Sequence, residues 1–298
     1  MHHHLLPRTF WPGLLCLAFL STPVSAQAPV QIAKAWELNG VLSRPESVIY
    51  DAERDVLYVS SINGGPGEKD GNGYLSKISP EGETIEKEWV TGLNAPKGLA
   101  LSNGKLYVSD IDELVEIDPG TGSISARYPA EGAQFLNDVT ADAAGNVYVS
   151  DSGNSLIYRL AGGALEIWLK DDRIASPNGV FAEASQLLVA AGNGTAENPG
   201  SSRYMQSISY DAKAIAPLKD DVPIGSLDAV EPDGKGGYFL TDWGAGKIMY
   251  FTPEDGAVLL GQLGQGTADL DFAPEKNMLF LPIMMSDQLV AYTVTWND

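Results

Sequence analysis

Short alternating runs of apolar and small polar residues recur along the chain at regular intervals. Three of them read Leu/Val-Tyr-Val-Ser, and three more are degenerate copies in the same register. They begin 40 to 51 residues apart, and this spacing of strand-like units predicts a six-bladed β-propeller. The six motifs are Leu57–Ser60, Leu106–Ser109, Val147–Ser150, Leu187–Ala190, Tyr238–Thr241 and Leu279–Pro282.

Each repeat also contains enough alternation for four antiparallel strands. The third repeat predicts strands over Val139–Ala143, Val147–Ser150, Leu156–Leu160 and Ala164–Leu169, separated by turns or loops rich in Gly, Asn and Ser. No segment keeps a 3.6-residue period over three turns. We therefore predict an all-β fold, with residues 27–298 as one propeller domain.

The sixth repeat is one strand short. It offers strands over Asp269–Ala273, Met278–Ile283 and Gln288–Val294, and then the chain ends. A further strand pattern, Val30–Leu38, precedes the first repeat. Because a propeller must close its ring, we expect Val30–Leu38 to form the outer strand of blade six.

Two repeats carry longer segments between their second and third strands, Asn63–Asn72 and Gly192–Ser202. The first is Gly-rich, but no Lys-Ser/Thr pair ends it and no helix pattern follows, so it does not predict a phosphate-binding loop. Either segment fits a variable surface loop or a lid at the rim of the ring.

The N-terminal 26 residues have the pattern of a secretory signal peptide. Arg8 precedes an apolar run, Trp11–Leu20, and Val24-Ser25-Ala26 forms a small-x-small cleavage pattern. The run is short for a stable membrane anchor. We expect cleavage after residue 26 and a periplasmic or secreted protein, the alternative being a retained amphipathic or membrane tail.

This interpretation limits the chemistry of the mature chain. The three histidines, His2, His3 and His4, and the one cysteine, Cys16, all precede residue 27. Ser-His-Asp and Cys-His catalysis, zinc bound by His or Cys, and disulfides are then excluded. A formal net charge of −20 also disfavours nucleic acid and anionic membranes as partners.

Polar residues stand just before the innermost strand of most repeats. The registers agree to within one residue when they are measured from the repeated motif, so these positions should encircle the central channel at one face. The two long segments should overhang the same face. The six equivalent positions are Glu46, Lys97, Asn137, Asn178, Asp228 and Ala268.

These positions, which we call the inner ring, suggest a divalent-cation site. Two carboxylates repel each other in one channel unless a cation lies between them, and carboxylate and amide oxygens are ligands that Ca²⁺ prefers. Channel waters, with Lys97 as counter-ion, are the alternative to a metal. The predicted ligands are Glu46, Asn137, Asn178 and Asp228.

The inner-ring motifs resemble those of the regucalcin/gluconolactonase family of six-bladed propellers. The resemblance spans residues 27–298 and rests on Arg44-Pro45-Glu46, Leu136-Asn137-Asp138, Asp142–Gly145, Pro177-Asn178-Gly179, and Asp228 before Asp233-Gly234. It implies that Glu46, Asn178 and Asp228 bind a divalent cation, and that Asn137 contacts metal or substrate. Paraoxonase and diisopropyl fluorophosphatase resemble the same plan. Lys97 and the lack of a histidine depart from the pattern of some relatives.

We therefore expect a calcium-dependent lactonase that acts, as a monomer, on a small lactone or ester. Asp228 would be the general base, with Glu46 as the alternative base, and Lys97 would stabilise the oxyanion. The long loops of blades one and four would shape specificity.

A non-catalytic propeller that binds a small molecule, sugar or peptide on the same face is the first alternative. Asp110, Asp151, Asp242 and Trp243 would contribute to it, although aspartates after strands also form turns. A lyase or esterase similar to strictosidine synthase is a weaker alternative.

Overall fold

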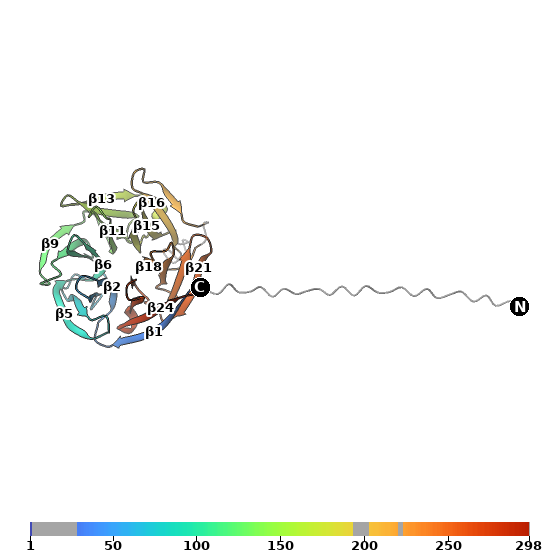
Figure 1. The fold of residues 1–298 in the computed structure, drawn as a ribbon. Coiled ribbons are helices and arrows are strands. Elements are labelled where there is room, and N and C mark those ends of the chain that lie inside the picture. Colours follow the sequence, from blue (N-terminus) through green and yellow to red (C-terminus); the bar gives the residue numbers. More distant parts are fainter. Residues whose placement is uncertain (2–28, 193–202, 220–222, 298) are drawn as a thin grey trace.

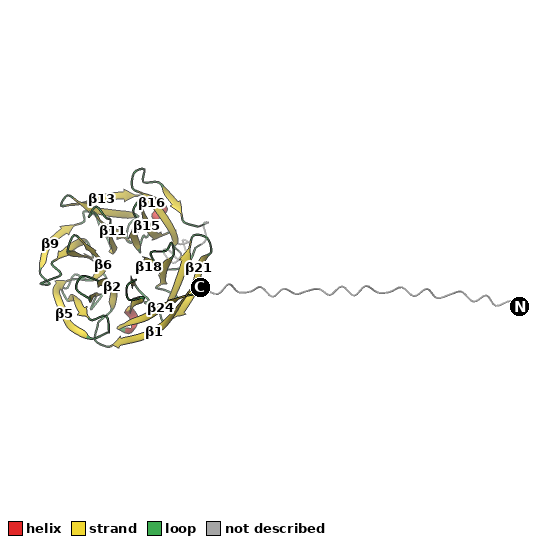
Figure 2. Ribbon diagram, viewed as in Figure 1, coloured by secondary structure: helices red, strands yellow, loops and turns green. Residues whose placement is uncertain are grey.

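A computed structural model describes residue 1 and residues 29–192, 203–219 and 223–297. In this part of the chain, six four-stranded antiparallel sheets are arranged in a ring around a central axis (Figure 1). Outside the strands, the described residues form loops, turns and two 3₁₀ turns, Asp172–Ile174 and Met284–Ser286 (Figure 2). The predicted all-β, six-bladed propeller is confirmed.

The first four strands after β1 form blade one, and the blades then follow in chain order. Blades one to three comprise β2 (Pro45–Asp51), β3 (Val56–Ser61), β4 (Gly73–Ile78), β5 (Thr84–Leu93), β6 (Pro96–Ser102), β7 (Lys105–Asp110), β8 (Glu113–Ile117), β9 (Ile124–Pro129), β10 (Leu136–Ala141), β11 (Val147–Asp151), β12 (Leu156–Ala161) and β13 (Ala164–Lys170). Blades four to six comprise β14 (Val180–Ala182), β15 (Gln186–Ala191), β16 (Tyr204–Ser209), β17 (Ile215–Pro217), β18 (Leu227–Pro232), β19 (Tyr238–Asp242), β20 (Lys247–Thr252), β21 (Gly256–Gln262), β22 (Asp271–Ala273), β23 (Met278–Ile283), β24 (Gln288–Trp296) and β1 (Val30–Asn39).

The N-terminal strand closes the ring, as predicted. β1 pairs antiparallel with β24 from Val30 opposite Trp296 to Asn39 opposite Gln288, and the two strands lie side by side in Figure 1. Trp36 on β1 also donates from Nε1 to the carbonyl oxygen of Pro80 in blade one (2.8 Å). The strand therefore both completes blade six and ties it to its neighbour.

Outside the innermost strands of the blades, the strand boundaries agree with the periodic pattern to within two residues. Predicted strand Met278–Ile283 matches β23 residue for residue, and both long segments fall between second and third strands. The loop of blade one is described throughout. Residues 193–202 of the other loop, and the predicted signal peptide after Met1, lie outside the described residues.

The inner-ring residues do not all precede their strands, which corrects one prediction. Glu46, Lys97, Asn137 and Asp228 are the second residues of β2, β6, β10 and β18. In each of these strands the pairing register shifts across the inner-ring residue and the residue after it. An extra residue at a β-bulge redirects the side chains beside it, which explains why the alternation pattern placed these strand starts too late.

The repeated Ser or Thr of the motif stabilises three of these bulges. The backbone N–H after the inner-ring residue donates to its hydroxyl: Ser47 N to Ser60 Oγ (3.0 Å) in blade one, Asp138 N to Ser150 Oγ (3.0 Å) in blade three. In blade five, Ala229 donates in the same way to Thr241 Oγ1 (2.8 Å). The hydroxyl thus satisfies a donor that the shifted strand pairing leaves open.

The hydrophobic core lies between neighbouring blades. One cluster joins Tyr107 and Leu114 of blade two to Val147 and Tyr158 of blade three. At the channel the blades approach so closely that a Cβ on Gly179 would lie 2.1 Å from the carbonyl oxygen of Asp228. Glycine is therefore required directly after Asn178.

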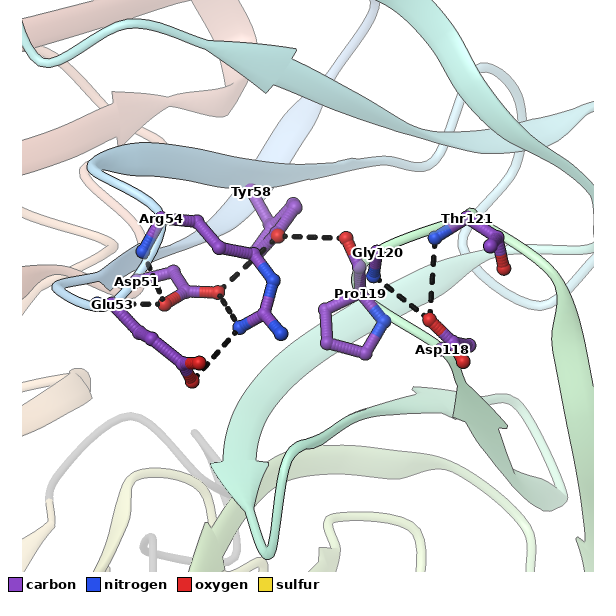
Figure 3. A network of polar contacts seen from close by, with 8 residues as sticks. All are labelled: Asp51, Glu53, Arg54, Tyr58, Asp118, Pro119, Gly120 and Thr121. Carbon is purple, nitrogen blue, oxygen red and sulfur yellow. Dashed lines mark hydrogen bonds and ion pairs between the residues drawn. The ribbon is translucent and has the colours of Figure 1, made fainter.

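Polar contacts also join blades at the face opposite the inner ring. Tyr58 of β3 contacts Pro119 O (3.2 Å) in the outer hairpin of blade two and Asp51 Oδ2 (3.3 Å) (Figure 3). Asp51 in turn accepts from Arg54 Nη1 (3.0 Å). The tyrosine of the repeated motif thus links two blades through its hydroxyl.

Candidate functional site

A cavity of about 350 Å³ at one end of the channel gathers the polar inner-ring residues. Its lining includes Glu46, Lys97, Asn137, Asn178 and Asp228, which come from five different blades. The structure therefore brings together every polar residue that the sequence placed in the inner ring. The sixth position, Ala268, is fully buried in an apolar cluster and does not line the cavity.

Two residues near the cavity, each followed by a proline, have a left-handed backbone conformation. Arg44 and Ser176 precede Pro45 and Pro177 and have φ angles of 51° and 47°. A non-glycine residue adopts this left-handed conformation at a cost of about 1 kcal/mol or more, so other contacts must hold it. Arg44 is held by Asp287, whose Oδ1 accepts from its backbone N–H (2.7 Å).

Glu46 is a buried acid with an unsatisfied oxygen. Its Oε2 has no hydrogen-bond partner in the described structure, and the residue is only 7% exposed. Burial raises the pKa of Glu46 well above its usual value, the charges of Asp228 and Asp269 raise it further, and Lys97 lowers it. The carboxylate of Glu46 therefore needs a cation or a proton.

Asp228 shares the cavity and is less strongly perturbed. Burial raises the pKa of its carboxyl to about 6, while the charge of Arg203 and a hydrogen bond from Asn178 lower it. Its Oδ1 accepts from Asn178 Nδ2. Of the two cavity carboxylates, Asp228 is the one whose pKa suits a base near neutral pH.

The two asparagines use their amide nitrogens within the protein. Asn178 Nδ2 donates to Asp228, and Asn137 Nδ2 donates to Ser152 Oγ (3.0 Å), which in turn donates to Pro177 O (2.5 Å). Among the described residues, neither amide oxygen accepts a hydrogen bond. The two oxygens are therefore the atoms available to a cation or a ligand.

Lys97 contributes a buried cation. The residue is 1% exposed, its Nζ lies 4.4 Å from the centre of the Phe135 ring, and it donates to Ala95 O (2.9 Å). Burial lowers the pKa of Lys97 to about 8, while the charges of Glu46 and Asp110 raise it. Lys97 is therefore still mainly protonated at neutral pH.

The hydrogen bond of Lys97 replaces a backbone bond that the other blades make. In each of those five blades, the first residue after the second strand donates its backbone N–H to a backbone carbonyl two or three residues before the inner-ring residue. In blade two no such bond from Ile111 occurs among the described residues, and Ile111 has a φ of 59°. The five bonds are Ile62 N to Arg44 O (3.2 Å), Ser152 N to Phe135 O (2.9 Å), Gly192 N to Ala175 O (3.0 Å), Trp243 N to Ser226 O (2.9 Å) and Met284 N to Gly266 O (2.7 Å).

Arg203 is a cavity residue that the sequence did not indicate. It is 8% exposed and donates from Nε to Ser176 O (3.0 Å) and from Nη1 to Leu227 O (3.0 Å). Arg203 directly follows the long segment of blade four and belongs to no repeated motif, so the register gave no signal. Also missed as lining residues were Arg44, Ile62, Phe135, Ser226 and Met284, whereas Pro66 belongs to the long segment of blade one that was predicted to overhang this face.

Three aspartates were proposed for the non-catalytic binding site, Asp110, Asp151 and Asp242, but their carboxylates accept hydrogen bonds from the backbone of nearby loops. Asp110 accepts from the backbone N–H groups of Asn94 and Ala95 (2.8 Å each). Asp151 accepts likewise from Phe135 (2.9 Å), and Asp242 accepts from Ala245 N (2.9 Å). None of the three lines the cavity, whereas Trp243 does. The turn-forming interpretation therefore fits these aspartates.

A second cavity, of about 190 Å³, lies along the inner strands. Four acids line it, and burial raises the pKa of each. Asp138 and Asp269 nevertheless have donors, Val180 N (2.6 Å) and Ser47 Oγ (2.7 Å) respectively. The four acids are Asp138, Glu231, Asp269 and Asp271.

Comparison with solved structures agrees with this architecture. A protein described as a candidate gluconolactonase superposes with a TM-score of 0.67 at 18% identity, covering 91% of this chain and 94% of the other. A gluconolactonase from Xanthomonas campestris gives 0.65 at 15% identity, covering 91% and 96%. An inactive virginiamycin B lyase variant from Staphylococcus aureus, with quinupristin, gives 0.59 at 15% identity, covering 90% and 100%.

These likenesses show a shared fold. The gluconolactonase structures are consistent with the family resemblance of the inner-ring motifs. A scan against protein-family models matched none, and a search of curated proteins found no relative. Function is therefore inferred from the residues of the cavity.

Proposed function

We propose that this protein is a divalent-cation-dependent lactonase, with Ca²⁺ as its cation. The observation that carries the proposal is the buried, unpartnered Oε2 of Glu46 in a cavity shared with the carboxylate of Asp228. Two acids at one buried site favour a bound cation. The two available amide oxygens add neutral ligands of the type that Ca²⁺ accepts.

The residues present fit such an ion. Glu46, Asn178 and Asp228 would hold it, with Asn137 as a further ligand or a substrate contact. When bound, the ion would supply Lewis acidity that polarises the ester carbonyl. The Asn178–Asp228 hydrogen bond holds two of the proposed ligands together before any ion binds.

Asp228 is the proposed general base. Its carboxylate would take a proton from the attacking water as the water oxygen bonds to the carbonyl carbon. The ester C–O bond of the lactone then breaks, and the leaving alkoxide takes the proton back from Asp228 to give a hydroxy acid. Burial raises the pKa of Asp228 to about 6 in the cation-free site, and a bound cation would lower it, so the carboxyl is ionised and able to act as a base at neutral pH; Glu46 is the alternative base.

Lys97 is proposed to stabilise the oxyanion of the tetrahedral intermediate. Lys97 lines the cavity, and Ala95 O and the Phe135 ring fix the position of its ammonium group. A fixed positive charge in a site shielded from water stabilises developing negative charge more than a solvated one does.

A lyase reaction of the virginiamycin B type has less support. The lyase variant that shares the fold is catalytically inactive after replacement of one histidine by alanine. The histidines of this chain are His2, His3 and His4, all in the predicted signal peptide. Hydrolysis with a carboxylate base needs no histidine, so we favour the lactonase.

The test is a lactone panel assayed on protein that begins at residue 27. The protein is stripped with a chelator and divided between Ca²⁺-containing and Ca²⁺-free buffer, and acid release is followed in a pH-stat. We expect turnover that depends on Ca²⁺. Absence of both Ca²⁺ binding and turnover would favour the non-catalytic binding propeller.

We also propose that the chain is exported and acts as a monomer in the periplasm or outside the cell. The signal-peptide pattern before residue 27 supports export. Among the described residues, no helix has the length and apolarity needed to cross a membrane. Mass spectrometry of exported protein should show a terminus near Gln27, and an intact Met1 would contradict this.

A further inference from the structure

A second ring of residues lies in register beyond the inner ring. Each member is the first residue after the second strand of its blade, which places it four residues after the second residue of the repeated motif. We call them the mouth residues. In blade order they are Ile62, Ile111, Ser152, Gly192, Trp243 and Met284.

The mouth residues are apolar on one side of the ring only. Blades five, six, one and two, which are neighbours because the ring is closed, supply Trp243, Met284, Ile62 and Ile111. Blades three and four supply a serine and a glycine. The apolar side is therefore continuous over four blades and ends where Asn137 and Asn178 stand in the inner ring.

Three of these four apolar residues line the 350 Å³ cavity. Ile62, Trp243 and Met284 do so together with Pro66, from the long loop of blade one, and Phe135. Ile62 and Met284 belong with Ile111 to one apolar cluster, against which Trp243 packs. We call the apolar wall of the cavity the apolar arc, and its residues are Ile62, Pro66, Phe135, Trp243 and Met284. It faces the same space as Glu46 and Asp228, so the cavity combines a reactive polar floor with an apolar wall.

Backbone bonds fix the arc. Trp243 donates its backbone N–H to Ser226 O (2.9 Å), and its carbonyl oxygen accepts from Gly266 N (2.8 Å). The second of these bonds joins blade five to the segment that leads into blade six. Met284 donates to Gly266 O (2.7 Å). A wall held in this way is formed before a ligand arrives, so a ligand that covers it buries apolar area without ordering the protein first.

We infer that the substrate of this site is a lactone with an apolar alkyl or aryl substituent rather than a polyhydroxylated sugar lactone. The inference rests on the proposed lactonase function and specifies its substrate class. With the ester on the polar floor, a substituent reaches the arc, which offers carbon and sulfur surface. Sugar hydroxyls placed there would lose their hydrogen bonds to water without replacement, whereas an alkyl chain gains from burial.

The first test compares three six-membered lactones on the Ca²⁺-loaded protein: δ-valerolactone, δ-decalactone and glucono-δ-lactone. We expect kcat/KM for δ-decalactone to exceed that for δ-valerolactone by roughly tenfold or more, because several methylenes are buried. Glucono-δ-lactone should be the poorest of the three. Equal or better turnover of glucono-δ-lactone would overturn the inference and leave the lactonase proposal standing.

The second test changes the arc. Trp243→Gln and Met284→Gln should each lower the ratio of kcat/KM for δ-decalactone to that for δ-valerolactone by about fivefold or more, mainly through KM. Met284→Leu should keep the ratio within twofold. Ile85→Gln, on the exposed outer strand β5, is the matched surface control and should change neither lactone. An unchanged ratio in both arc variants would overturn the inference.

A binding experiment separates failure of the inference from failure of the lactonase proposal. The lactams piperidin-2-one and 6-pentylpiperidin-2-one resist hydrolysis and match the two simpler lactones. In calorimetry on wild-type protein we expect the pentyl compound to bind at least tenfold more tightly. If the protein hydrolyses no lactone but shows this difference, the lactonase proposal fails and the arc remains a binding site. Equal lactam affinities would refute the arc even if lactones are hydrolysed.

Discussion

Lys97 lowers the pKa of Glu46 without forming a direct ion pair with it. The charge of each residue shifts the pKa of the other, yet no N–O distance of 4.0 Å or less joins them among the described ion pairs. Lys97 instead donates to Ala95 O. The unpartnered Oε2 of Glu46 is therefore not satisfied by the lysine, and a cation can still bind to it.

Replacement of Lys97 separates two roles for this lysine. We expect Lys97→Met to lower kcat by about 100-fold, as loss of an oxyanion donor does, while Ca²⁺ affinity stays level or rises modestly. Calorimetric Ca²⁺ titration and lactone turnover of both proteins measure this. A large gain in Ca²⁺ affinity with unchanged kcat would show that Lys97 serves as the counter-ion in place of a metal.

Glu46→Gln removes one of only two anionic ligands from the proposed cation site. We expect Ca²⁺ affinity to fall at least tenfold, because the amide keeps an oxygen but loses the charge. Calorimetry after chelation and refilling is the measurement. Glu37→Gln, on the exposed part of β1, is the charge-matched control and should leave Ca²⁺ affinity unchanged.

Asp228→Asn should affect catalysis more than cation binding. The wild-type rate should rise with pH as the carboxyl of Asp228 loses its proton, and with Ca²⁺ bound this rise should lie below pH 6, because the cation lowers the pKa of about 6 that the carboxyl has without it. The amide cannot accept that proton, so we expect a fall in kcat of roughly 100-fold or more. A pH–rate profile decides the point. A variant that keeps the wild-type profile would exclude Asp228 as the base.

The buried acids predict an unusual pH dependence of folding stability. A carboxyl whose pKa is higher in the folded than in the unfolded state stabilises the fold at low pH, and this stabilisation is lost as pH rises from its ordinary pKa through its folded pKa. Asp228 and Asp271 have folded pKa values of about 6. Glu46, Asp138, Glu231 and Asp269 are shifted in the same direction.

In chelator, we therefore expect the melting temperature to fall between pH 5 and pH 7.5. Ca²⁺ should raise it more at pH 7.5 than at pH 5, because protons compete with the cation for the same carboxylates. Differential scanning calorimetry at the two pH values, with and without Ca²⁺, measures both effects. A melting temperature in chelator that rises over this interval would contradict the prediction.

Ring closure by β1 makes a direct prediction about stability. Deletion of residues 30–39 would leave the edge of β24 unpaired, and we expect a loss on the order of 5 kcal/mol or more, comparable to the whole stability of many domains. Trp36→Ala is the milder test and should cost about 3 kcal/mol, since it removes the packing on Phe280 and the bond to Pro80. Denaturant unfolding measures both, with Ile85→Ala as the surface control.

The repeat spacing by itself determined the architecture of this protein. Six copies of one strand motif, one strand missing at the end and one spare strand at the start allowed one closed ring, and β1 and β24 pair accordingly. The register of the repeats alone also predicted that Glu46, Asn178 and Asp228 lie close together, because equivalent positions in a circular repeat surround the axis, and all three line one cavity. Local periodicity and ring closure are properties of the chain that need no side-chain detail.

Only the tertiary structure decided how the gathered residues are paired and charged. The bulges that turn Glu46 and Asp228 into the cavity depend on hydroxyls from the neighbouring strand, and the alternation pattern could not locate them. Arg203 reaches the cavity from the end of an insertion with no repeat register. Lys97 bonds to Ala95 instead of Glu46 because the backbone of its blade differs at Ile111. Hydrogen bonds and pKa values depend on distances between segments far apart in the chain, and these distances exist only after folding.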